Sequence, residues 1–190
     1  MIKNIKTVSV IGLGYIGLPT AALLASNGYK VFGMDINESV VDTINKGEIH
    51  IVEPDLDLVV KTVVAEGRLE AFSDVQIADV YILCVPTPFY ADNDLKIPNL
   101  EYIMNATSNI GNLIKEGDII ILESTSPVGT TKLIEKTLYE KGVDITAIHI
   151  AYCPERVLPG QIMRELVAND RIVGGVTEKS SKLVANFYSS

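Results

Sequence analysis

A glycine-rich turn between two short apolar segments near the start of the chain constrains its fold more than any other feature. Thr7–Ile11 is β-branched and apolar, as a buried strand should be, and it runs directly into Gly12-Leu13-Gly14-Tyr15-Ile16-Gly17. A helix rich in small residues is expected next, followed by a strand over residues 29–34 that is closed by Asp35. This order of strand, G-x-G-x-x-G turn, helix, second strand and acid indicates a βαβ unit that binds a dinucleotide.

Each glycine of the motif has its own expected role. Gly12 permits the tight turn, Gly14 lets the backbone approach a pyrophosphate, and Gly17 lets the helix pack closely on the strand. The phosphates would lie at the positive end of that helix, near its N–H groups. Asp35 is placed to accept hydrogen bonds from the adenosine ribose, and its charge would repel a 2′-phosphate. Residues 36–38 supply no Arg or Lys, so NAD is expected rather than NADP. The alternative is a purely structural turn.

The composition excludes several other classes of protein. A chain of 190 residues with 47% hydrophobic content fits one domain with an ample core. Its net charge of −8, with acids and bases interspersed, argues against a nucleic-acid surface. No apolar run could span a bilayer and residues 1–6 lack a signal-peptide core, so we expect a cytoplasmic protein without a membrane partner. Cys84 and Cys153 have no metal-ligand spacing, and no metal site is expected.

The rest of the chain alternates between predicted strands and helices. Strands are predicted over 68–72, 78–85, 118–122, 145–152 and 171–173. Helices are predicted over 38–46, 54–66, 100–114 and 130–140, the last with Thr130 as its cap, and from 178 onward. Residues 90–94 are expected to form a loop, and a loop or short helix is expected to run to Val167. This alternation predicts an α/β fold, a Rossmann-type doubly wound parallel sheet with helices on both faces. Right-handed crossovers favour the strand order 3-2-1-4-5-6, with a crevice between strands 1 and 4.

Polar groups follow three more of the predicted strands. They are Val85-Pro86-Thr87-Pro88, Glu123-Ser124-Thr125 and Pro154-Glu155-Arg156. Ligands of doubly wound sheets bind beyond the carboxyl ends of the strands, so these groups are expected to line one crevice with the glycine turn. Structural alternatives stay open: Thr87 as a rigid turn, Ser124 and Thr125 bonded to their own backbone, and Glu155 with Arg156 as a surface ion pair.

Cysteine and histidine offer weaker candidates for chemistry. Cys153 lies at the end of a predicted buried strand, where a thiol usually behaves as a small hydrophobic group and not as a nucleophile. His149 falls within that same strand, and neither it nor His50 has the spacing of a metal ligand.

Four segments together resemble the UDP-glucose/GDP-mannose dehydrogenase family. They are Val-Ile-Gly-Leu-Gly-Tyr-Ile-Gly-Leu-Pro at 10–19, Val-Pro-Thr-Pro at 85–88, Glu-Ser-Thr-Ser-Pro-Val-Gly-Thr-Thr at 123–131 and Pro-Glu-Arg at 154–156. The resemblance covers the whole chain, and it implies oxidation of the 6-hydroxymethyl group of a nucleotide sugar to a carboxylate with two NAD and water. Residues 152–160 and 169–175 look most like members acting on UDP-N-acetyl-D-mannosamine; another UDP-sugar or GDP-mannose is the alternative.

The resemblance also implies roles for single residues. Tyr15 and Ile16 would contact the pyrophosphate through their N–H groups, and the cofactor would be flanked by Val85, Pro86, Thr87, Ser124 and Thr125. Glu155 and Thr125 would be catalytic: Glu155 would help position or activate the water, and Thr125 would flank the cofactor toward its nicotinamide half. Arg156 and Val157 would touch the sugar nucleotide. Members that use glucose carry a second glutamate where this chain has Pro159, which makes glucose doubtful.

The family forms its covalent intermediate on a cysteine that these residues do not include, together with a supporting Lys and Asn. The resemblance therefore implies that residues 1–190 are one NAD-binding domain at the start of a longer enzyme, with a central helix and a nucleotide-sugar domain beyond. We expect this chain to bind NAD without turning over a UDP-sugar. A homodimer is expected for the full-length enzyme, and the state of this chain stays open. Two rival hypotheses are a β-hydroxyacid or 6-phosphogluconate-type dehydrogenase and an NAD-sensing module without chemistry.

Overall fold

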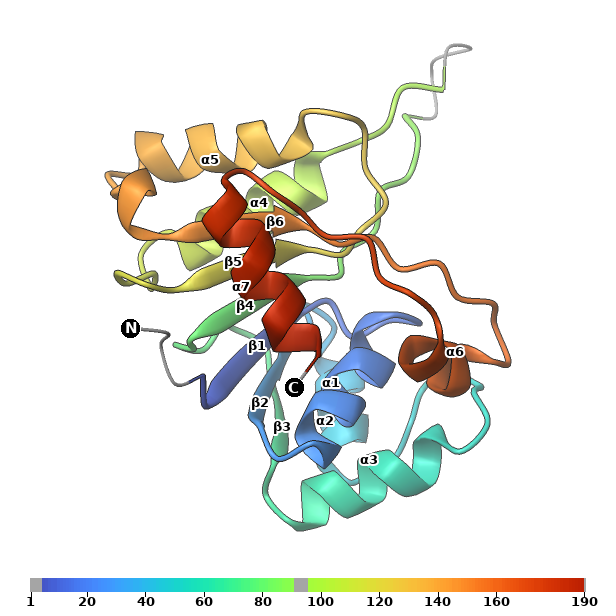
Figure 1. The fold of residues 1–190 in the computed structure, drawn as a ribbon. Helices are drawn as coiled ribbons and strands as arrows, with labels where there is room; N and C mark the ends of the chain where they lie inside the picture. Colours follow the sequence, from blue (N-terminus) through green and yellow to red (C-terminus); the bar gives the residue numbers. More distant parts are fainter. Residues whose placement is uncertain (1–4, 91–95, 190) are drawn as a thin grey trace.

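A computed structural model describes residues 5–90 and 96–189 (Figure 1). Its centre is a seven-stranded sheet in the order β3-β2-β1-β4-β5-β6-β7. The strands are β1 (Thr7–Ile11), β2 (Lys30–Met34), β3 (Leu69–Phe72), β4 (Val80–Leu83), β5 (Ile119–Leu122), β6 (His149–Tyr152) and β7 (Gly174–Gly175). Strands β1 to β6 run parallel, and β7 pairs antiparallel with β6. The predicted order 3-2-1-4-5-6 and the Rossmann-type fold are confirmed.

Helices cover both faces of the sheet. They are α1 (Gly17–Ser26), α2 (Glu38–Asn45), α3 (Leu56–Ala65), α4 (Glu101–Ile110), α5 (Thr130–Glu140), α6 (Ile162–Ala168) and α7 (Glu178–Tyr188). One core cluster joins side chains of α1, α2, α3 and α7 to the sheet, and a second joins α4 and α5 to the opposite face. In Figure 1, α7 crosses the strands on the side that also carries α1. Within the described ranges, no helix is both long enough and apolar enough to cross a membrane.

The central strands are apolar throughout because both of their faces are covered. All four residues of β5 are buried: Ile119 and Ile121 belong to the cluster with α1 and α7, and Ile120 and Leu122 to the cluster with α4 and α5. Successive side chains of a strand point to opposite faces, which accounts for this division. A strand covered on one face only would alternate apolar and polar residues.

The strand register places the predicted site residues at one level. Ile11 pairs with both Met34 and Leu83, Leu83 pairs with Leu122, and Leu122 pairs with Tyr152. The residues that follow these five strand ends are Gly12, Asp35, Cys84, Glu123 and Cys153. The loops after β1, β2, β4, β5 and β6 therefore leave the sheet side by side, at its carboxyl edge.

Several predicted boundaries were wrong. The strand predicted at 171–173 is absent, and the chain instead pairs with β6 at Gly174–Gly175. The first part of the strand predicted over 145–152 is a 3₁₀ turn, Ile145–Ala147, whose first N–H groups are held by Asp144. The strand predicted over 78–85 is confined to Val80–Leu83, and the helix predicted to reach residue 114 ends at Ile110.

Thr130 does not cap α5. Gly129 is the cap, with a φ of 94°, and Thr130 is the first helical residue, with its hydroxyl donating to the carbonyl of Pro127 at 2.7 Å. A left-handed φ is open to glycine at little steric cost, so the turn into the helix depends on backbone geometry here and not on a side-chain acceptor. The expected loop at 90–94 falls almost entirely outside the described residues.

Candidate cofactor and substrate site

The glycine turn sits between the end of β1 and the start of α1. Gly12 has a φ of 91°, and a Cβ there would lie 2.6 Å from the carbonyl oxygen of Cys84. A Cβ on Gly17 would lie 1.7 Å from the carbonyl oxygen of Gly12. Packing within the protein therefore requires both glycines. Gly14 differs, because a Cβ built on it meets nothing within 4 Å.

The open space at Gly14 faces the end of a helix that lacks an internal partner for its first N–H groups. Tyr15, which follows Gly14, is half exposed, and Ile16 is the N-cap without a side-chain acceptor of its own. Helix N-termini with free N–H groups bind anions readily. The turn thus offers backbone donors beside an open position that carries no side chain.

Asp35 lies next to the glycine turn and also stabilises it through hydrogen bonds. One carboxylate oxygen accepts a hydrogen bond from Leu13 N at 2.9 Å, and the other accepts one from Asn37 N at 3.0 Å. A carboxylate has about four acceptor positions. The partly exposed Asp35 therefore keeps acceptor capacity for ribose hydroxyls while it braces the glycine turn, a role that the sequence did not indicate.

The loops after β4 and β5 are joined by their hydroxyl groups. Thr87 donates to the carbonyl of Thr125 at 2.7 Å, and the buried Ser124 donates to the carbonyl of Val85 at 2.7 Å. These bonds fix the segment Val85-Pro86-Thr87 against the β5 loop. The side chain of Thr125 is exposed, and the described part of the chain offers its hydroxyl no partner. Among these residues, Thr125 is the one whose hydroxyl is open to a ligand.

Glu155 is not part of a surface ion pair with Arg156. Its side chain is only 6% exposed, and it forms an ion pair with Arg171. Burial raises the pKa of the Glu155 carboxyl to about 6, although the Arg171 charge opposes this. Arg156 is exposed and Val157 is half-buried, so the residues predicted to meet the sugar nucleotide lie on the accessible side of the same loop.

Glu123, which was expected to line the crevice with Ser124, is buried. Its carboxylate accepts hydrogen bonds from Tyr188 at 2.5 Å, Cys84 at 3.2 Å and Thr20 at 3.4 Å. It also lies 3.4 Å from Arg171, which therefore contacts two carboxylates. We call Glu123, Glu155, Arg171 and Tyr188 the buried charge cluster.

The sequence carried a signal for this cluster that was not used. Ile119 and Ile121 face α1 and α7, and a strand places every second residue on the same face. Glu123 continues that series, so its carboxylate had to be buried and had to find a cation. Arg171 is that cation, although the apolar Ile172 and Val173 beside it predict a strand there.

A second carboxylate that the sequence did not single out holds the loop after β6. Glu53, only 4% exposed, accepts hydrogen bonds from Gly160 N at 2.8 Å and Ile162 N at 2.7 Å. It comes from the irregular segment between α2 and α3, far away in the sequence. Leu158 N donates to Glu165 at 2.8 Å within the same loop. The segment 154–162, which we call the β6 loop, is therefore tied down at several points.

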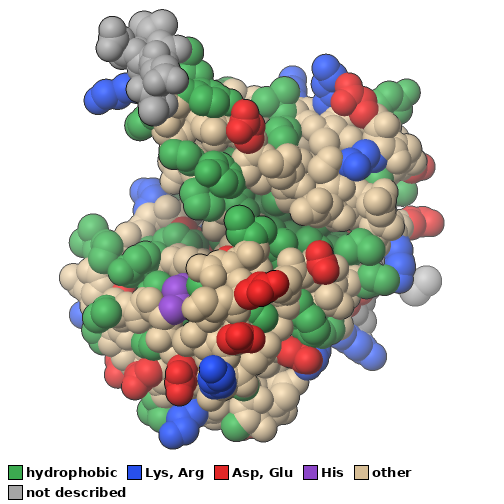
Figure 2. Space-filling model, turned by 180° about the vertical axis from the view of Figure 1, so that it is seen from behind, with side chains coloured by type: hydrophobic (Ala, Val, Ile, Leu, Met, Phe, Trp, Pro, Cys, Tyr) green, Lys and Arg blue, Asp and Glu red, His purple; other side chains and the backbone are tan. Residues whose placement is uncertain are grey.

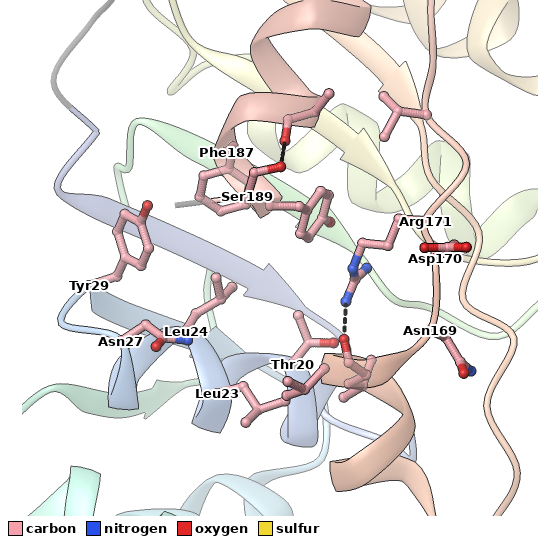
Figure 3. Close-up of a pocket in the computed structure, with 15 residues that line it drawn as sticks. Thr20, Leu23, Leu24, Asn27, Tyr29, Asn169, Asp170, Arg171, Phe187 and Ser189 are labelled. Carbon is pink, nitrogen blue, oxygen red and sulfur yellow. Dashed lines mark hydrogen bonds between the residues drawn. The ribbon is translucent and has the colours of Figure 1, made fainter.

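A cavity of about 440 Å³ lies between α1, α7 and residues 166–173. Figure 3 shows Arg171 reaching into it toward Thr20 of α1, with Phe187 of α7 and the following Ser189 on another side. None of the residues predicted to bind cofactor or substrate lines this cavity. Arg171 and Tyr188 of the buried charge cluster do line it. The opposite side of the molecule is hollowed between an upper and a lower part, and apolar side chains gather along that hollow (Figure 2).

Both cysteines are free thiols that face the interior. Burial raises the pKa of Cys153 to about 11, and burial together with Glu123 raises the pKa of Cys84. A thiol that stays protonated is a poor nucleophile, which agrees with the interpretation of Cys153 as a small buried group. His149 is buried in β6 and lies 3.4 Å from the hydroxyl of Ser180, and the described residues hold no group of side chains that could bind a metal ion.

Comparison with known proteins shows which family the chain is similar to. A model of the NAD binding domain of the UDP-glucose/GDP-mannose dehydrogenase family matches residues 6–190. The UDP-N-acetyl-D-mannosamine dehydrogenase of Campylobacter jejuni is 53% identical over 195 residues, covering 98% of this chain and 47% of that protein. The NDP-N-acetyl-D-galactosaminuronic acid dehydrogenase of Ralstonia nicotianae is 48% identical over 194 residues, covering 97% and 45%.

The solved structures agree. The UDP-N-acetyl-mannosamine dehydrogenase Cap5O from Staphylococcus aureus superposes with a TM-score of 0.92 at 38% identity, over 97% of this chain and 45% of that one. The chain thus spans about half the length of the curated relatives it matches.

Proposed function

The chain belongs to the UDP-glucose/GDP-mannose dehydrogenase family, whose NAD-binding domain it matches, and from this premise we propose that it serves the oxidation of a nucleotide sugar at C6. The substrate that we favour is UDP-N-acetyl-D-mannosamine, oxidised to its uronate with two NAD and water. Family membership accounts for the site better than a β-hydroxyacid or 6-phosphogluconate-type dehydrogenase does.

The observation that carries the proposal is the contrast among the three glycines. Gly12 and Gly17 are required by the protein's own packing, whereas nothing inside the protein requires Gly14. A purely structural turn would leave Gly14 without a reason, and a pyrophosphate approaching the backbone supplies one. The residues present therefore fit NAD: the N–H groups from Gly14 to Gly17 would hold the phosphates, and Asp35 the adenosine ribose.

The loops after β4 and β5 would border the reacting end of the cofactor, with the Thr125 hydroxyl facing it. When bound, NAD supplies the hydride acceptor for each of the two oxidation steps. Glu155 would act on the water that completes the oxidation. Its raised pKa of about 6 suits that task, since a general base works best when its pKa lies near the working pH.

The choice of sugar rests on two observations. The relatives named above act, by their names, on N-acetylated sugars. Pro159 stands where members that use glucose carry a second glutamate, so this chain has a rigid apolar residue at a position that is acidic in those members. Exposed Arg156 would pair with the diphosphate or the sugar hydroxyls, and Val157 would pack beside it.

The rest of the proposal concerns the whole enzyme. Residues 1–190 would be its NAD-binding domain, a further domain would supply the catalytic cysteine, and the full-length enzyme would be a homodimer. The two free thiols suit the reducing cytoplasm, where we place it. A binding module without chemistry is the second candidate, but it gives no reason for a buried acid with a perturbed pKa at the sheet's carboxyl edge.

Calorimetric titration of NAD into three forms of the chain tests the proposal. Wild type should bind, and Gly14→Ala should bind at least about tenfold more weakly, a loss of about 1.4 kcal/mol. Gly174→Ala is the matched control, since its Cβ also meets nothing within 4 Å but lies in β7, away from the turn. Equal affinity of all three forms, with folding intact, would contradict the assigned site.

A further inference from the structure

The buried charge cluster joins Glu155 to parts of the fold that never reach the crevice. Arg171 Nη1 contacts the carboxylates of both Glu155 and Glu123. The guanidinium also stacks on the ring of Tyr188, with its central carbon 4.2 Å from the ring centroid. One cation therefore serves two buried acids, and the second acid is held in turn by the Tyr188 hydroxyl.

We propose that Glu123 is a positioning residue for Glu155 and acts through Arg171, whose guanidinium the two carboxylates share. This inference rests on the proposed role of Glu155 and adds to it a residue that is buried against α1 and α7. Because Glu123 takes part of the attraction of Arg171, Glu155 is less fully neutralised than it would be in an exclusive pair. A less neutralised carboxylate is a stronger base.

The other groups around Glu155 do not change this balance. Arg156, its chain neighbour, is exposed and adds a weaker positive influence. Tyr188 belongs to the cluster, and Cys84 and Cys153 lie near it, but burial raises the pKa of all three, so they stay neutral near pH 7. The charged groups that matter are thus one guanidinium and two carboxylates, the second of which, Glu123, contributes a negative charge that disfavours ionisation of Glu155.

The geometry predicts the direction in which the pKa of Glu155 changes when Glu123 is replaced. Replacing Glu123 by Gln removes a negative charge and leaves Arg171 to Glu155 alone. Both changes favour the ionised carboxylate, so the pKa of Glu155 should fall by about one unit. The change Glu165→Gln is the control: it touches the β6 loop at Leu158 without contacting Arg171, so a merely structural disturbance of the loop would appear there too.

The test is a ¹³C NMR titration of the glutamate carboxyl groups of this chain, with the Glu155 signal assigned by its loss in Glu155→Gln. A lower pKa of Glu155 in Glu123→Gln, with no such fall in Glu165→Gln, supports the proposal. An unchanged or higher pKa in a folded Glu123→Gln overturns it, and so does an equal fall in both variants.

If Glu123→Gln fails to fold, the same titration of the wild-type chain still tests the proposal. Carboxylates that share one guanidinium titrate as a coupled pair, so the titration curve of Glu155 should depart from that of a single isolated site. A single simple curve for Glu155 would overturn the proposal. The titration needs neither NAD nor nucleotide sugar, so a chain that binds no NAD would refute the proposed function and leave this test standing.

Discussion

Glu53 offers a sharp test of how the β6 loop is held in place. Its buried carboxylate accepts the N–H groups of Gly160 and Ile162, at 2.8 Å and 2.7 Å. Gln has nearly the same shape, but its amide oxygen can accept only on one side. In Glu53→Gln one of the two bonds becomes a neutral hydrogen bond, and the other N–H faces an NH₂ group that cannot accept.

The expected cost follows from those two bonds. A hydrogen bond to a charged group contributes about 1.5–3 kcal/mol, and a buried donor left unpaired costs about 1–3 kcal/mol. We therefore expect Glu53→Gln to lower the free energy of unfolding by about 2–4 kcal/mol. For a domain of this size that corresponds to a fall in Tm of about 4–16 °C.

Urea unfolding followed by circular dichroism measures the global effect, and amide hydrogen exchange measures the local one. Exchange at Gly160 and Ile162 should speed up more than at core amides such as Ile120. Glu48→Gln is the control, because Glu48 is exposed in the same irregular segment and its replacement should change stability by less than about 0.5 kcal/mol. If Glu53→Gln were as stable as that control, the idea that Glu53 anchors the β6 loop would be wrong.

Two further predictions concern titratable groups. Burial lowers the pKa of His149, so the unfolded chain binds more protons than the folded chain as the pH falls through about 6.5. The difference in Tm between wild type and His149→Asn should therefore shift against the wild type as the pH falls from 7.5 to 5.5. Cys153, with a pKa near 11 and no exposed surface, should resist iodoacetamide at pH 8 in the folded chain and react only after unfolding, as mass spectrometry can follow; rapid labelling of the native chain would show that the thiol is accessible.

The parts of the fold that the sequence predicted well are those governed by one strong local pattern. The glycine turn and the uniformly apolar strands β4 and β5 leave few alternatives, because only a sheet covered on both faces buries such segments. The errors lie where local pattern and tertiary pairing disagree. Ile172 and Val173 look like a strand, yet the edge of the sheet pairs with the two glycines that follow them.

The residues of the candidate site fall into the same two groups, those that a local pattern predicts and those that depend on distant partners. Motif residues such as Gly14 and Asp35 could be predicted as site residues because their expected chemistry depends on spacing along the chain. Glu53 and Arg171 were missed because their importance comes from partners about 110 and 16 residues away, at Gly160–Ile162 and at Glu155, and no periodicity reports such a pairing. A buried charge on the core face of a strand was the available clue, since such a charge must find a partner.

Arg171 and Glu53, the two residues that the sequence analysis missed, explain how an exposed loop can keep one fixed conformation. Arg171 holds the β6 loop at its start, through Glu155, and Glu53 holds it at its end, through two backbone bonds. Between these anchors, residues 156–159 are largely accessible, and Pro159 fixes its own backbone dihedral. The carboxylates of both anchors, Glu53 and Glu155, are buried, where hydrogen bonds are stronger and loss of one partner is costly. These anchors hold the loop in place by contacts within the protein. Under the proposed function, selection among nucleotide sugars would then depend on a surface formed before binding, and changes at the anchors should alter that selection without touching the sugar.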